Sequence, residues 1–87
     1  MTSLDWVGQP VPVSTLLTGR QGTVHSLRGG HDFRSRIANL GFTVGASLKV
    51  MQNYGHGPII VSVRGTLVAL GRGEAALVLV KPLKENA

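Results

Sequence analysis

The sequence predicts a small mainly-β domain, a barrel of about five short strands with one or two short helices inserted. Runs of Val, Leu and Ile recur along the chain and are separated by glycines. Closing such strands into a barrel removes the exposed edges that an open sheet would present. One segment has instead the apolar spacing of a helix of about two turns, which nucleates too poorly to be stable alone in water. This helix must therefore pack against the strands.

The first 20 residues indicate an arm followed by a turn. Residues 1–12 contain two prolines separated by one valine and a tryptophan, Trp6. We expect them to form an extended arm, with Trp6 packed on the domain, involved in dimerisation or loose. Ser14 is placed to cap a single helical turn that Gly19 ends. Residues 21–27 then form the first predicted strand.

The inserted helix is predicted from three apolar residues and its two ends. Phe33, Ile37 and Leu40 lie at i, i+4 and i+7, so they share one helical face that we expect to be buried. Asp32 is suited to the N-cap or the first turn of this helix. Gly41 follows the last apolar position and can adopt the left-handed conformation that ends a helix.

The second half of the chain predicts four more strands, a polar tail and no second domain. Residues 55–57 contain two glycines and form a hairpin loop, while Arg64-Gly65 forms a tight turn. Residues 71–76 are predicted to be a loop or a helical turn. The strands themselves are 47–54, 58–63, 66–70 and 77–82. The predicted organisation is an arm over 1–12, a barrel over 13–82 and a tail over 83–87.

Composition restricts the classes of function. Nine Lys and Arg against four Asp and Glu give a net charge of +5, which favours nucleic acid, an acidic protein face or an anionic membrane surface as partner. The basic residues are dispersed, so the charge alone does not choose between these partners. The absence of cysteine excludes disulfides and Cys-ligated metals. The first residues lack a signal-peptide pattern and no apolar run could span a bilayer, so we expect a cytoplasmic protein.

No set of residues predicts an enzyme, a metal site or a cofactor. The carboxylates lie far apart in the sequence, at Asp5, Asp32, Glu74 and Glu85. A general acid and base pair would need two of them together. Three histidines could be surface or structural side chains, or iron ligands, but they lack the spacing of a metal site: His25, His31 and His56. We expect the first interpretation.

A partner-binding surface is the remaining hypothesis. Arg34 and Arg36 project away from the apolar stripe of the helix, and arginines beside aromatic side chains are typical of interface centres. The alternative for the arginines is a solvated face. Phe42 could contribute to a docking surface only if it is exposed, and the alternative is that it belongs to the core. Tyr54 could likewise contribute only if it is exposed. The predicted docking residues are Arg34, Arg36, Phe42, Arg64 and Arg72.

Several of these residues, in this order and spacing, resemble the FeoA family, the small cytoplasmic proteins of bacterial ferrous iron uptake. The resemblance covers residues 13–82 and is sharpest in Arg34-x-Arg36-Ile37-x-x-Leu40-Gly41-Phe42-x-x-Gly45. It continues in Gly57-Pro58-Ile59 and Ala69-Leu-Gly-Arg72. Two departures are Val44, where the family often has proline, and the arm, which matches no family motif.

The resemblance implies an SH3-like barrel and a non-enzymatic accessory role. The implied partner is FeoB, a membrane protein with a cytoplasmic GTPase domain, which this chain would bind and modulate. Binding would recruit it to the inner face of the membrane, and self-association stays open. The alternative is an SH3-like nucleic-acid-associated module or a relative of the SH3-like domain of iron-dependent repressors. The dispersed basic residues favour the first hypothesis, because nucleic-acid binders of this size usually cluster them with aromatic residues.

Overall fold

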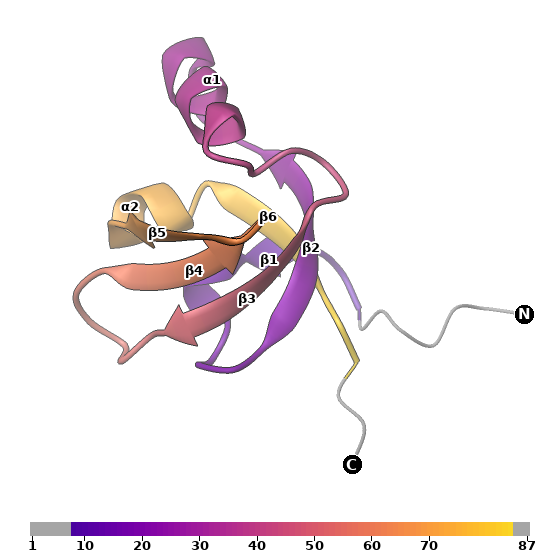
Figure 1. The fold of residues 1–87 in the computed structure, drawn as a ribbon, viewed down its shortest axis with the longest axis vertical. Coiled ribbons are helices and arrows are strands. Elements are labelled where there is room, and N and C mark those ends of the chain that lie inside the picture. The colour runs from indigo at the N-terminus through magenta and orange to yellow at the C-terminus, as the bar shows by residue number, and fades with distance from the viewer. Residues whose placement is uncertain (1–7, 85–87) are drawn as a thin grey trace, which may run out of the picture.

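The computed structural model describes residues 8–84, so the predictions on Trp6 and on the ends of the arm and tail lie outside the described residues (Figure 1). A six-stranded antiparallel sheet has the order β1-β6-β2-β3-β4-β5. The elements along the chain are β1 (Val11–Pro12), the 3-10 helix η1 (Val13–Thr15), β2 (Gln21–Leu27), α1 (His31–Asn39), β3 (Ser47–Gln52), β4 (Ile59–Val63), β5 (Thr66–Leu70), α2 (Arg72–Ala75) and β6 (Val78–Pro82).

The sheet curls into an open barrel. Its register shifts between Val24 and Ser26 opposite β6, and between Val50 and Gln52 opposite β4. Such irregularities bend a strand and increase its twist, which lets so few strands wrap around one core. The predicted mainly-β barrel is confirmed, but its two end strands, β1 and β5, are not paired with each other.

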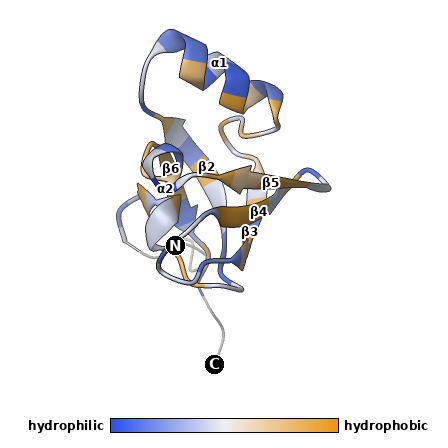
Figure 2. Cartoon of the chain, turned by 90° about the vertical axis from the view of Figure 1, so that its left-hand side faces the viewer, coloured by the Kyte–Doolittle hydropathy of each residue, from blue (hydrophilic) through white to orange (hydrophobic). Residues whose placement is uncertain are grey.

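The core is aliphatic apart from one aromatic ring. Alternate residues of each strand point inward, as in β4, where Ile59, Val61 and Val63 are buried and the residues between them are only half-buried. Phe42 follows α1 and is fully buried among these side chains. The strands β4 and β5 show the corresponding hydrophobic colour in Figure 2. Burial of this apolar surface is the main force that holds the barrel together.

Three local predictions differ from the structure. β1 pairs with β6, so the sheet includes the last two residues of the predicted arm. The single turn is centred on Ser14, which lies inside η1 and provides no side-chain cap. Leu40 is 40% exposed, so the prediction that it is buried with the rest of the apolar stripe is wrong. The physical reason is that α1 stands at the end of the barrel (Figure 1) and reaches the core through Ile37, whereas Leu40 is the C-cap residue after the helix and lies outside the core cluster.

Candidate protein-docking site

α1 presents different chemistry on different sides. It begins after Gly30, which provides no side-chain cap, and ends where Gly41 adopts φ 112°. One side packs on the barrel through Ile37, the only fully buried residue of the helix, and through the half-buried Phe33. Because so little of α1 is buried, most of its surface is available to a partner.

A second side of α1 borders an open groove of about 450 Å³. The helix contributes residues at i, i+3, i+4 and i+7, which lie on one face: His31, Arg34, Ser35 and Ala38. The opposite wall is the end of β2, with Ser26 and Leu27. Val44, from the loop that follows α1, completes the groove. Its lining is mainly apolar, with hydroxyl groups and two basic side chains among it. Such a groove can hold an apolar side chain and pair a neighbouring carboxylate with Arg34.

Arg34 is the basic residue of this groove whose guanidinium is available to bind a partner. Its side chain is exposed, and within residues 8–84 its guanidinium makes no hydrogen bond or ion pair. Val44 on the other side of the groove is 73% exposed. The groove is thus lined by an exposed apolar side chain and by a guanidinium that is unpaired within residues 8–84, which suits a partner that carries both an apolar and an acidic group.

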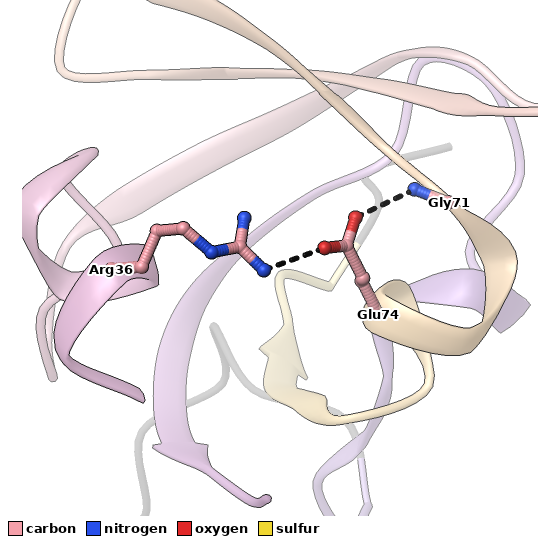
Figure 3. A network of polar contacts seen from close by, with 3 residues as sticks. All are labelled: Arg36, Gly71 and Glu74. Atoms are coloured by element: carbon pink, nitrogen blue, oxygen red, sulfur yellow. Dashed lines mark hydrogen bonds and ion pairs between the residues drawn. The ribbon is translucent and has the colours of Figure 1, made fainter. Parts of the chain in front are cut away.

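Arg36 lies on another side of α1 and is already paired. Its Nη2 donates to Oε2 of Glu74 on α2 at 2.7 Å, and its guanidinium lies 5.6 Å from the centre of the Phe33 ring. Oε1 of Glu74 accepts a hydrogen bond from the backbone N–H of Gly71 at 3.1 Å (Figure 3). Arg36 and then Gly71 lower the pKa of the Glu74 carboxyl from its ordinary value. The ion pair links α1 to α2 across the end of the barrel, so Arg36 has a structural role before any partner arrives.

Arg64 holds the chain that leaves α1. It occupies the left-handed region with φ 49°, in the two-residue turn between β4 and β5. Its Nε donates to the carbonyl oxygen of Gly41 at 3.3 Å and its Nη2 to Oγ1 of Thr43 at 2.8 Å. The guanidinium is exposed and lies beside Gly41, just after α1. It can therefore contact only a partner that covers the C-terminal end of the helix.

Arg72 and Phe42 do not belong to this surface. The half-buried Arg72 donates hydrogen bonds to the carbonyl oxygens of Gly57 and Ser14 at 3.2 and 3.3 Å, and to Oδ1 of Asn53 at 3.2 Å. It therefore joins η1 to the β3–β4 loop, two segments that are far apart in the sequence. Phe42 is 0% exposed, so the condition for its docking role is not met and the core interpretation holds.

The predicted docking residues thus do not form a single surface. Arg34 and Arg36 lie on different sides of α1, and Arg64 at its end. Tyr54 is 68% exposed, but it belongs to the loop between β3 and β4, at the end of the barrel away from α1 (Figure 1). Sequence reasoning missed the groove residues Ser26, Leu27, Ser35, Ala38 and Val44. The helical spacing of His31, Arg34, Ser35 and Ala38 was a signal for one wall of the groove, but no local signal indicated the other.

Within the described residues no group of three or more His, Cys, Asp or Glu side chains is placed to hold a metal ion. His25, His31 and His56 are all exposed and lie on β2, on α1 and in the β3–β4 loop. The two carboxylates in this part of the chain, Asp32 and Glu74, lie on different helices. No helix in residues 8–84 has the length and apolar character needed to cross a membrane.

Known proteins share this sequence pattern. The FeoA domain model matches residues 11–82. Over 70 residues the chain is 31% identical to a Methanocaldococcus jannaschii protein named Fe(2+) transport protein A, and the match covers 80% of this chain and 84% of that relative. The matched region includes the groove and all strands of the sheet.

Solved structures share the fold as well. The crystal structure of an iron uptake regulatory protein, FeoA, matches with a TM-score of 0.81 at 39% identity, covering 86% of this chain and 100% of that one. Zinc-complexed Stenotrophomonas maltophilia FeoA, described as a prokaryotic SH3 domain protein, matches at 0.73 and 26% identity, covering 85% and 91%. These likenesses confirm the SH3-like fold. A manganese-dependent transcriptional repressor matches at 0.80 but only 22% identity, covering 88% of this chain and 43% of the repressor, and shows the fold alone.

Proposed function

This chain belongs to the FeoA family, and on that premise we propose that it serves ferrous iron uptake as an accessory protein that binds and modulates the FeoB membrane GTPase. The family match carries the proposal, because it spans residues 11–82, which include every helix and strand of the domain. The name of the M. jannaschii relative supports the link to Fe(2+) transport. The protein would act in the cytoplasm and be recruited to the inner face of the membrane by this partner.

The groove beside α1 is the docking surface that the geometry favours. Its apolar lining would take a side chain of the partner, and the guanidinium of Arg34, which is unpaired within residues 8–84, would bind a carboxylate through charge-assisted hydrogen bonds. The net charge of +5 would attract an acidic partner surface from a distance. Arg64 extends the basic character to the end of the helix, whereas Arg36 would have to leave Glu74 before it could contribute.

Regulation would follow from a difference in affinity. A binding module shifts the conformational equilibrium of a GTPase only if it binds one nucleotide state more tightly than the other. No residue of this chain needs to take part in the chemistry of GTP hydrolysis for that effect. The proposal is therefore of a binding module and not of an enzyme.

The test is an NMR titration of isotopically labelled protein with the cytoplasmic GTPase domain of the cognate FeoB, in GDP and in a non-hydrolysable GTP analogue. Shifts should be concentrated on the groove, and their nucleotide dependence would show regulation. Arg34→Glu should weaken binding at least about tenfold, since it places a like charge opposite the partner's carboxylate. Lys49→Glu, the same reversal on an exposed position of β3, is the matched control and should change affinity much less. Absence of binding in both nucleotide states would refute the proposal.

The alternative is a nucleic-acid-associated module, and the salt dependence of its affinity for DNA would distinguish it from the first proposal. Duplex DNA binding would weaken with a slope of about −0.9 per neutralised phosphate in a plot of log affinity against log salt. Salt-insensitive or absent DNA binding would remove this alternative. The repressor likeness does not add to it, because at 22% identity it concerns the fold alone.

A further inference from the structure

β5 is an end strand whose outer edge has no partner among the described residues. The sheet order ends at β5, and its only register is with β4. Val63 pairs with Thr66 across the two-residue turn, so this is the first hydrogen-bonded pair of the hairpin. Bonded pairs alternate along antiparallel strands. The backbone groups of Thr66, Val68 and Leu70 therefore face β4, and those of Leu67 and Ala69 face outward.

This edge lacks the protection that natural sheets usually give their end strands. Charged residues, prolines and bulges normally prevent another strand from adding to an open edge. Residues 66–70 contain neither charge nor proline, and the pairing of β5 with β4 is regular. Thr66, Leu67 and Ala69 are exposed, Leu67 to 66%. By contrast, the other end strand, β1, has only two residues, one of them Pro12.

A basic side chain stands at one end of the open edge and an ion pair at the other. Arg64 lies in the turn that precedes β5. Gly71 directly follows β5, and its N–H bonds Glu74, whose other carboxylate oxygen holds Arg36 at 2.7 Å. A carboxylate on an incoming segment could bind Arg64 at the end of the strand next to the turn, whereas Glu74 already neutralises Arg36 at the other end.

We propose that the outer edge of β5 accepts an extended acidic segment of the partner protein as an additional strand. This inference rests on the proposed function and assigns a second contact, made through the backbone and separate from the groove. Strand addition derives affinity from main-chain hydrogen bonds, here from the N–H and C=O groups of Leu67 and Ala69. The side chain of Leu67 provides an apolar contact beside them. A second copy of this chain suits the edge less well, because each copy carries a net charge of +5.

The direct test needs no mutation. Amide hydrogen exchange at Leu67 and Ala69 should be fast in the free protein and slow at least about tenfold when the FeoB GTPase domain is bound. The amides of Val68 and Leu70, which bond β4, should be protected in both states. Binding without any change at Leu67 and Ala69 would overturn this inference and leave the proposed function intact. Absence of any binding would refute both.

A proline variant tests the same point by affinity. Leu67→Pro removes an outward N–H and leaves the bonds to β4 in place, so the fold should persist and partner binding should weaken by about tenfold. Leu67→Ala is the matched control, because it shortens the same side chain but keeps the N–H, and it should bind more tightly than Leu67→Pro. Equal affinity of both variants would overturn the inference. Protection of Leu67 that grows with protein concentration alone, together with dimers in sedimentation, would assign the edge to self-association instead.

Discussion

Replacing Ile37 by alanine should cost far more stability than replacing Leu40, although both belong to the apolar stripe of α1. Ile37 is fully buried, and truncation of a buried isoleucine costs about 2–5 kcal/mol through lost transfer free energy and the cavity left behind. Leu40 is 40% exposed, so only part of a full burial value of about 1.5–3 kcal/mol is lost and no closed cavity forms. We expect about 1 kcal/mol for Leu40→Ala.

The assay is urea unfolding followed by far-ultraviolet circular dichroism, with thermal melts in parallel. For a domain of this size each kcal/mol corresponds to roughly 4–8 °C in Tm. Ile37→Ala should therefore lower Tm by at least about 8 °C, and Leu40→Ala by about 4–8 °C. The dependence of the free energy of unfolding on urea should stay unchanged, because neither variant alters the surface exposed on unfolding much.

Equal losses for the two variants would refute this reasoning. That result would mean that Leu40 is as deeply buried as Ile37 and that the end of α1 is positioned differently from Figure 1. Ile37→Val serves as a graded control, since removing one buried methylene should cost about 0.5–1.5 kcal/mol.

Three further predictions concern contacts outside the helix face. The lowered pKa of Glu74 means that its pair with Arg36 stabilises the fold above the carboxyl's unfolded pKa and that this contribution is lost as pH falls through the folded value. Glu74→Gln should therefore be less stable than wild type at pH 7, by less than about 1 kcal/mol because both groups are over a third exposed, and the difference should shrink as pH falls through the folded pKa of Glu74. Arg72→Lys loses the planar fork that joins η1 to the β3–β4 loop and should cost about 1–3 kcal/mol in urea unfolding; an unchanged midpoint would show that these bonds contribute nothing. Gly22→Ala places a Cβ 2.6 Å from the carbonyl oxygen of Lys81, so Tm should fall by about 8 °C or more, and a wild-type Tm would mean that β2 and β6 separate easily.

Much of the fold could be predicted because its signals are local. The alternation of Ile59, Val61 and Val63 and the turn at Arg64-Gly65 each depend on neighbouring residues, and both predictions are confirmed. The 66–70 strand matches β5 in both bounds for the same reason. The end of β3 and the start of β1 were harder to predict, because pairing with a distant strand decides where each strand begins and ends.

The candidate site was only partly predictable, because side-chain partners come from elsewhere in the chain. The sequence indicated that Arg34 and Arg36 leave the apolar face of a helix, but not that Glu74, 38 positions away, neutralises one of them. Arg72 resembled a surface residue until its three acceptors came together around it. Phe42 could be exposed or buried on local evidence, and packing buried it.

Residue type and short-range spacing specify the mainly-β class, the inserted helix and the turns, and they carry the family resemblance. Packing between distant elements buries Ile37 but leaves Leu40 exposed, places the groove between α1 and β2, and leaves β5 with an open edge. These features depend on how elements distant in the chain pack and on which strand ends the sheet. Hydrophobic burial and hydrogen-bond pairing are satisfied over the whole domain, so no local window of sequence contains that information.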